Sequence, residues 1–218
     1  MAKTVKMSYK TPLLPLSWVT ITGDGKLKMN KDGSGGSSDY NYTVTVTFPD
    51  EVSMKVEKAK FDKFWRENKP AGLTKQSYDM FKPEMTADLD ANGKEQFDED
   101  DALIKKPTGR WTLAAKTLTQ WPDGKANVVK VLRANGNPLD LGDKLIGNDS
   151  IGILHGTVGI NAFPGNEGLA FYLNTIQLKK FVEYTDGDEV EAEDLGDDEG
   201  LDDVELDAAD VSKDTPNV

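Results

Sequence analysis

The alternation of apolar and polar residues is clearest over residues 40–48. Tyr42, Val44, Val46 and Phe48 alternate there with three threonines. A period of two is typical of a β-strand with one apolar face. Comparable stretches, bounded by turn residues, predict further strands at 14–21, 111–117, 127–133, 150–160 and 169–184.

One segment has helical periodicity instead. Residues 51–68 follow Asp50, a good N-cap, and stop at the Lys-Pro-Ala-Gly sequence of 69–72. The apolar side is expected to comprise Val52, Met54, Val56, Ala59, Phe61 and Trp65. Lys55, Glu57, Lys58 and Lys60 are expected to face water. A short second helix is predicted over residues 73–81.

The remaining segments are predicted to be loops and turns. Residues 32–38 are rich in glycine and serine and predict a flexible loop, while residues 84–101 predict an acidic one. Turn residues cluster at 122–124, 135–138 and 163–166. Five to seven strands with one inserted helix favour a mainly β fold, a small closed or half-closed barrel.

Charge divides the chain into two parts. Residues 183–218 hold 16 acids and 1 base, a net charge of −15. Since the whole chain has 38 acids and 26 bases, residues 1–182 carry 22 acids and 25 bases, a net charge of +3. A dense run of like charge with few large apolar residues is expected to be disordered. We therefore predict a folded domain over residues 1–184 and an acidic tail over 185–218.

Several kinds of chemistry find no support in the residues. The absence of cysteine excludes disulfides and thiolate sites. The only histidine, His155, lies among apolar residues and is expected to be structural, and the glycines around it, such as Gly156 and Gly159, indicate tight strands and bulges. The N-terminus does not resemble a signal peptide, and no apolar run nears the roughly 20 residues of a membrane helix. We expect no enzyme, no cofactor and no membrane partner.

One local motif matches the pattern of a calcium loop. Residues 88–99 place oxygen ligands and a turn glycine at the required spacing. The candidate ligands are Asp88, Asp90, Asn92 and Glu99. Prolines at 83 and 107 interrupt the flanking helices of an EF-hand, and no second loop is present. A solvated acidic turn is the favoured interpretation.

Cations and aromatic residues recur over the β segments. Single-stranded nucleic acid is bound by cations that neutralise phosphates and by aromatic rings that stack on bases. The candidates are Lys26, Lys28, Tyr40, Tyr42, Lys105, Lys106, Arg110, Trp111, Lys116, Trp121, Lys130, Arg133, Phe163 and Tyr172. Trp18, Trp111 and Tyr42 are each better explained as core residues. Strand alternation puts Trp111 opposite Lys116 and favours exposure of Tyr172.

The order of these pieces resembles the phage-encoded single-stranded-DNA-binding proteins. The similar pieces are residues 42–49, the helix at 51–68, the acidic loop, and the segments 109–116, 128–131, 137–139, 156–163 and 168–177. The resemblance covers most of residues 10–184. It implies an OB-fold, binding of single-stranded DNA in phage replication, recombination or repair, and residence in the cytoplasm of the infected bacterial host.

The resemblance also implies a role for the tail. Such proteins often end in an acidic segment that contacts replication or recombination proteins and competes with DNA for the basic groove. The partner-binding residues would be Asp197, Asp198, Glu199, Asp202 and Asp203. One difference is that this chain ends Thr-Pro-Asn-Val rather than on an aromatic tip.

Two other hypotheses stay open from the sequence. The chain could be an acidic protein-interaction module or DNA mimic on a β scaffold, with the tail as the active element. A calcium-regulated protein would rest only on residues 88–99.

Overall fold

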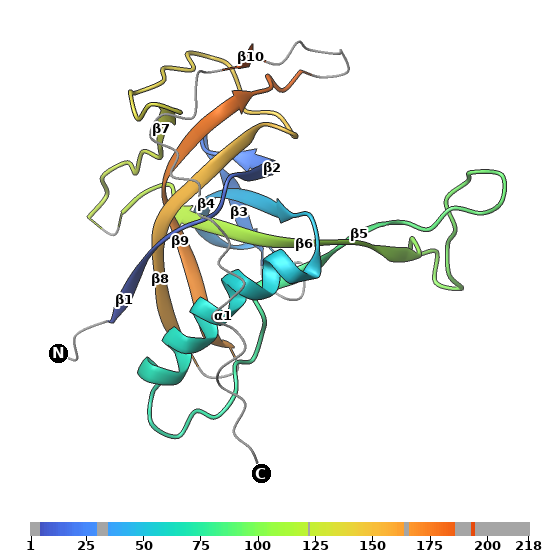
Figure 1. Cartoon of the computed structure of the whole chain (residues 1–218), viewed down its shortest axis with the longest axis horizontal. Coiled ribbons are helices and arrows are strands. Elements are labelled where there is room, and N and C mark those ends of the chain that lie inside the picture. Colours follow the sequence, from blue (N-terminus) through green and yellow to red (C-terminus); the bar gives the residue numbers. More distant parts are fainter. Residues whose placement is uncertain (1–4, 30–34, 122, 164–165, 186–192, 195–218) are drawn as a thin grey trace.

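Most segments with period-two alternation form strands (Figure 1). The computed structural model describes residues 5–29, 35–121, 123–163, 166–185 and 193–194. The strands are β1 (Lys6–Lys10), β2 (Leu14–Thr20), β3 (Lys26–Met29), β4 (Gly35–Phe48), β5 (Phe81–Ala87), β6 (Lys105–Leu118), β7 (Lys130–Arg133), β8 (Ile151–Phe163), β9 (Asn166–Phe181) and β10 (Glu193–Asp194). The helix α1 spans Glu51–Asn68. Within this described part, no helix is long and apolar enough to cross a membrane.

Strand pairing closes a ring of five strands. β2 pairs with β4, β4 with β6, β6 with β9, β9 with β8, and β8 with β2. The fourth and fifth strands of the ring exchange places relative to chain order, which is a Greek-key arrangement. The predicted mainly β fold of OB-fold type with one inserted helix is confirmed. The predicted disordered tail falls mostly outside the described residues, but Glu193–Asp194 within it form β10 and pair with β9.

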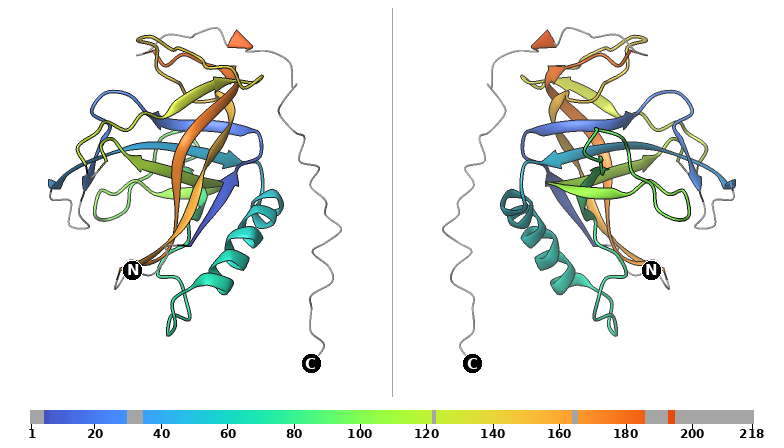
Figure 2. Two further views of the ribbon diagram at one scale, coloured as in Figure 1. Left: turned by 90° about the vertical axis from the view of Figure 1, so that its left-hand side faces the viewer. Right: turned by 90° about the vertical axis from the view of Figure 1, so that its right-hand side faces the viewer.

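The core fills the ring and extends under α1, which covers one end of it (Figure 2). Alternate residues of the strands point inward and are fully buried, among them Val44, Val46, Leu113, Phe171 and Leu173. The helix contributes Met54, Phe61, Phe64 and Trp65. The ring of Phe61 meets those of Tyr9 and Phe81 edge-on, at centroid distances of 4.7 and 5.1 Å.

The helix has the predicted bounds but not the predicted faces. Asp50 caps it, since its Oδ1 accepts a hydrogen bond of 2.7 Å from the Ser53 amide. Val52, which we expected in the core, is 74% exposed. Glu57, which we expected in water, is only 1% exposed. Both expectations were wrong because the buried side is defined by Phe61, Phe64 and Trp65, and Glu57 lies on that side.

Two donors compensate the burial of Glu57. The Tyr9 hydroxyl donates to Glu57 Oε2 over 2.7 Å, and Lys60 Nζ donates to Oε1 over 2.8 Å. Burial, together with the negative charge of Glu57, raises the pKa of Tyr9 far above its ordinary value, so the hydroxyl remains a donor at any physiological pH. This bond joins β1 to α1 across 48 residues of sequence.

Two further segments differ from the structure that their local sequence predicted. Residues 73–80 are irregular and bent rather than helical, and Phe81 begins β5. The segment binds the β8–β9 hairpin instead: the Ser77 amide donates to the Glu167 carbonyl over 2.7 Å, and the Tyr78 hydroxyl donates to the Leu169 carbonyl over 2.7 Å. β4 begins at Gly35, inside the predicted flexible loop, because β3 pairs with it there.

The sequence also understated the extent of β structure. β1, which we did not predict, pairs along β8 from Lys6↔Gly159 to Lys10↔His155. The predicted acidic loop is largely a hairpin, since β5 reaches Ala87 and pairs with β6. The glycines of β8 do allow close strand contacts, as predicted: a Cβ at Gly156 would lie 2.0 Å from the Tyr172 carbonyl oxygen.

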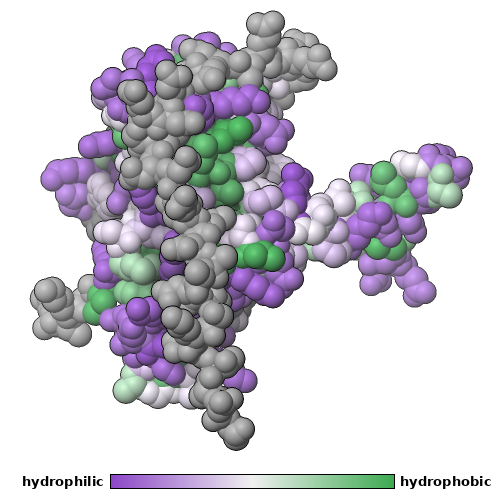
Figure 3. Space-filling model, viewed as in Figure 1, coloured by the Kyte–Doolittle hydropathy of each residue, from purple (hydrophilic) through white to green (hydrophobic). Residues whose placement is uncertain are grey.

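Beyond the ring, β5 and β6 continue as a projecting arm, defined here as residues 84–110 (Figure 1). Residues 84–104 of the arm carry eight carboxylates and one lysine, Lys94. Apolar surface lies among the hydrophilic surface of the arm (Figure 3). The exposed apolar residues are Met85, Leu89, Phe97 and Ile104.

Replacing Tyr9 with phenylalanine is expected to destabilise the fold by about 1.5–3 kcal/mol, because the buried Glu57 carboxylate loses one of its two donors. Thermal unfolding followed by circular dichroism measures the effect. Lys55→Gln is the matched control, since it removes the exposed ion pair of Lys55 with Glu51 and is expected to cost less than about 0.5 kcal/mol. Equal stability of Tyr9→Phe and the wild-type protein would contradict the structural role of this bond.

Candidate nucleic-acid interface

A row of outward-facing residues crosses the ring. The strand registers pair Thr20 with Thr43, Thr43 with Lys116, Lys116 with Tyr172, and Tyr172 with Thr157. Paired residues of neighbouring strands point to the same face of a sheet. Lys116 is exposed, and Tyr172 is 40% exposed while its neighbours Phe171 and Leu173 are buried. The predicted exposure of Tyr172 is confirmed.

Lysines surround this row. Lys6 pairs with Gly159 on one side of it. On the other side, Lys10 pairs with His155, His155 with Thr175, and Thr175 with Lys130. Within the described residues, Lys6, Lys116 and Lys130 form no ion pair. We call the row and its lysines the outer face; its members are Lys6, Ser8, Lys10, Thr20, Thr43, Lys116, Lys130, His155, Thr157, Gly159 and Tyr172.

Carboxylates are missing from the strand segments that carry the outer face, whereas Asp39 of β4 and Glu167 of β9 lie earlier in their strands, outside those segments. These segments contain seven lysines and arginines and neither aspartate nor glutamate; they are residues 6–10, 14–20, 41–48, 112–118, 130–133, 151–162 and 168–181. The seven are Lys6, Lys10, Lys116, Lys130, Arg133, Lys179 and Lys180. A surface with one sign of charge attracts a polyanion even when the whole chain carries a net charge of −12.

The Tyr172 ring lies against β8. A Cβ at Gly159 would be 3.1 Å from Tyr172 Cε2, so the glycine leaves room for the ring. Tyr78 bounds the outer face at the hairpin end, where its ring would lie 2.9 Å from a Cβ at Gly168. Burial, with a smaller contribution from Tyr172, raises the pKa of Tyr78. Tyr172 is therefore positioned by the backbone beneath it and offers an aromatic surface to solvent.

The structure separates the predicted cluster at residues 105–116. Lys105, Lys106 and Arg110 lie on the arm, and ten residues of extended strand place Lys106 about 33 Å from Lys116. Lys106 Nζ is 2.9 Å from Asp88 Oδ1, and Arg110 Nε is 2.7 Å from Glu84 Oε2. These ion pairs reduce the positive charge that the arm presents.

The other predicted residues fall into three groups. Lys116, Lys130 and Tyr172 share the outer face, as described above. Trp111 and Tyr42 pack against the core, and Trp111 is opposite Lys116, as alternation predicted. Lys26 and Trp121 are exposed, and Arg133 is half-buried.

The side chains of several candidate DNA-binding and partner-binding residues are outside the described part of the structure. The backbones of Lys28, Tyr40 and Phe163 belong to β3, β4 and β8, and their side chains are outside the described part. Asp197, Asp198, Glu199, Asp202 and Asp203 lie outside the described residues altogether.

Sequence reasoning missed Trp18. We predicted a core residue, yet its ring is 67% exposed and Lys26 Nζ lies 5.8 Å from the ring centroid. The prediction was wrong because β2 shifts register against β4 between Ser17 and Thr20, and Trp18 falls in this bulge. Strand alternation alone cannot reveal such a shift.

The calcium candidate has other partners. Asp88 pairs with Lys106, and Asp90 Oδ1 accepts hydrogen bonds from the amides of Asn92 and Lys94 over 2.8 and 2.9 Å. These bonds to backbone amides lower the pKa of Asp90. In the part of the chain that the structure describes, no three histidine, aspartate or glutamate side chains are grouped to hold a metal ion. Calcium binding by residues 88–99 stays the untested alternative to the solvated acidic turn that the sequence favours. His155 has the expected structural contact, since its Nε2 is 3.0 Å from Gln177 Oε1.

Comparison with solved structures identifies the fold. The crystal structure of gp2.5, a single-stranded DNA-binding protein encoded by bacteriophage T7, is similar over 92% of this chain and 96% of that chain, with a TM-score of 0.51 and 15% identity. This chain shares the gp2.5 fold. The single-stranded DNA-binding protein from bacteriophage Enc34, in complex with ssDNA, is similar over 81% of this chain and 86% of that chain, with a TM-score of 0.48 and 13% identity. No family model and no curated protein matches the sequence.

Proposed function

We propose that this protein binds single-stranded DNA without sequence preference through its outer face, and that it is a binding protein rather than an enzyme. The observation that carries the proposal is the exposed Tyr172 beside Lys116, in strand segments 168–181 and 112–118 that hold no carboxylate. Lysines there would neutralise phosphates while bases stack on the ring. The fold shared with T7 gp2.5 supports this assignment.

The proposal extends to the biological setting and to the tail. The protein would protect single strands in phage replication, recombination or repair, in the cytoplasm of the infected bacterium. The net charge of −15 on residues 183–218 is complementary to the outer face. The tail would compete with DNA from a high effective concentration, because it is tethered to the same molecule. It would also dock replication or recombination proteins.

Two substitutions separate the roles of charge and stacking. Lys116→Gln removes one phosphate contact, and we expect it to weaken binding and to reduce the slope of log affinity against log salt by about 0.7. Tyr172→Ala removes a stacking surface, and we expect a loss of roughly 1–3 kcal/mol in binding with an unchanged salt slope. Fluorescence anisotropy of labelled oligo-dT across a salt series measures both quantities.

The matched control for the lysine is Lys63→Gln, because Lys63 is an exposed residue of α1 without a recorded ion pair in the described structure. It is expected to leave the affinity and the salt slope unchanged. If Lys63→Gln weakens binding as much as Lys116→Gln, the interaction is diffuse and the outer face is not the binding site.

Removing the tail is expected to tighten binding. A chain that ends at Tyr184 loses the competitor and should bind oligo-dT more tightly than the full chain, most clearly at low salt. The full-length control replaces Asp197, Asp198, Glu199, Asp202 and Asp203 with their amides and should shift affinity in the same direction. Unchanged or weaker binding by both variants would contradict competition by the tail.

The arm favours a second candidate function. Four exposed apolar residues on a projecting acidic hairpin are typical of a surface that contacts other proteins. An acidic interaction module on a β scaffold would use the arm and the tail and would not need the outer face. It predicts no binding of oligo-dT by the chain that ends at Tyr184, so the anisotropy experiment separates it from the first proposal.

A further inference from the structure

Trp18 combines exposure with an unfavourable backbone conformation. Its φ of 53° lies in the left-handed region, which residues other than glycine rarely adopt. The residue is 67% exposed, so burial does not offset the cost of this conformation. Strained residues that persist at exposed positions are concentrated at binding sites, and β-bulges commonly redirect a side chain. The stability of the fold therefore does not account for a tryptophan at this position.

The bulge is held firmly from the neighbouring segment. The Trp18 amide donates to Asn148 Oδ1 over 3.0 Å. On the same edge, the Leu16 amide donates to the Ser150 carbonyl over 2.7 Å, and the Asp149 amide donates to the Leu16 carbonyl over 3.0 Å. These bonds fix the backbone that carries the Trp18 ring.

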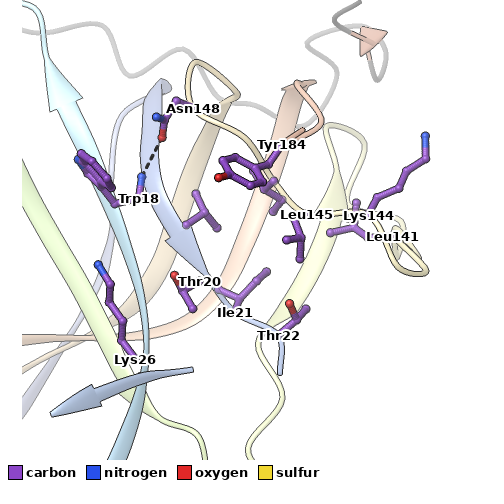
Figure 4. Close-up of a pocket in the computed structure, with 12 residues that line it drawn as sticks. Trp18, Thr20, Ile21, Thr22, Lys26, Leu141, Lys144, Leu145, Asn148 and Tyr184 are labelled. Atoms are coloured by element: carbon purple, nitrogen blue, oxygen red, sulfur yellow. Dashed lines mark hydrogen bonds between the residues drawn. The ribbon is translucent and has the colours of Figure 1, made fainter. Parts of the chain in front are cut away.

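The bulge borders a hollow of about 420 Å³ (Figure 4). Trp18 and Lys26 lie on one side of it, and Leu145 and Tyr184 on the other. The residues that line the hollow include two lysines, Lys26 and Lys144, and no carboxylate. Lys144 pairs with Glu183, 3.1 Å away and outside the lining, which leaves Lys26 as the cation beside the tryptophan.

The hollow is continuous with the outer face. Thr20 lines the hollow and is also the first member of the row that passes through Thr43 and Lys116 to Tyr172. Three strand spacings separate Thr20 from Tyr172, about 14 Å. A flexible strand lying over Tyr172 therefore reaches Trp18 without leaving the surface.

We propose that the hollow binds a base of the same single strand, stacked on Trp18, with a phosphate of that nucleotide beside Lys26. The inference rests on the proposed function and adds a site to it. The hollow offers an aromatic face, a cation and apolar walls without carboxylates. This combination suits a planar base joined to an anionic phosphate. A base already stacked and paired in a duplex cannot enter, so the site also favours single over double strands.

The test uses the full-length protein with Trp18→Gly and Trp18→Phe. Glycine accepts the left-handed φ, so Trp18→Gly is expected to keep or raise the melting temperature while weakening binding of an oligo-dT of about twelve nucleotides roughly tenfold. Phenylalanine keeps a stacking face and should retain most of the affinity. Val52→Ala is the control, because Val52 is an apolar residue of α1 that is 74% exposed, and it should change nothing.

Oligonucleotide length and fluorescence provide independent readouts. With an oligo-dT of about four nucleotides, near the lower limit of OB-fold site sizes, Trp18→Gly should weaken binding less than with the longer strand. Stacking should quench tryptophan fluorescence when the longer strand binds, and this quenching should be largely lost in Trp18→Phe. Trp65 is buried and contributes little, and because Trp111 and the exposed Trp121 are present in both proteins, the difference between the wild-type protein and Trp18→Phe reports Trp18.

The outcomes separate the two proposals. If Trp18→Gly binds the longer strand as tightly as the wild-type protein while Lys116→Gln binds weakly, the Trp18 site is overturned and the proposed function stands. Equal losses in Trp18→Gly and Val52→Ala would also overturn it, because the effect would not be local. Failure of the wild-type protein to bind any oligo-dT at low salt would instead remove the proposed function itself.

Discussion

The arrangement of the whole molecule depends on β9 being paired along both of its edges. β8 holds one edge along nearly its full length, from Ile151↔Lys180 to Phe163↔Asn166. The other edge meets β6 in parallel at Lys116↔Tyr172. Without this contact the sheet would be an open ribbon with exposed edges. The two residues of greatest functional interest thus lie at the closure of the ring, and their spacing is fixed by main-chain pairing rather than by a loop.

Ring closure also explains how a chain of net charge −12 can present a basic surface. Inward positions of the ring must be apolar, so charge is confined to outward positions, and in the strand segments that carry the outer face every such charge is positive. The carboxylates are concentrated in the arm and in residues 183–218. Acids on the ring itself would repel a polyanion at short range, where screening by salt is weakest. The overall charge therefore says little about the charge of the proposed binding surface, which depends on where each charged residue lies in the fold.

Local patterns were sufficient for part of the fold. The strand at 40–48 and the helix at 51–68 were predictable because a period of two, a helical period and the Asp50 cap are encoded by neighbouring residues. Segments that depend on distant partners were not predictable. Residues 73–81 bind a hairpin some 90 positions away, and β1 exists because β8 offers it an edge. Likewise, the exposure of Tyr172 followed from alternation, whereas the distance between Lys106 and Lys116 required the full length of β6.

Two residues reverse the usual burial preference, and they are informative in opposite ways. Glu57 is a buried carboxylate, and Tyr9 and Lys60 supply the donors that a buried carboxylate requires, so its position is explained by the fold alone. Trp18 is an exposed indole on a strained backbone, and its recorded ring contact within the described chain is the Lys26 ammonium group. An apolar residue that gains little from its own fold is best explained by a ligand. The same test of internal compensation therefore explains Glu57 by the stability of the fold and supports the proposed binding role of Trp18.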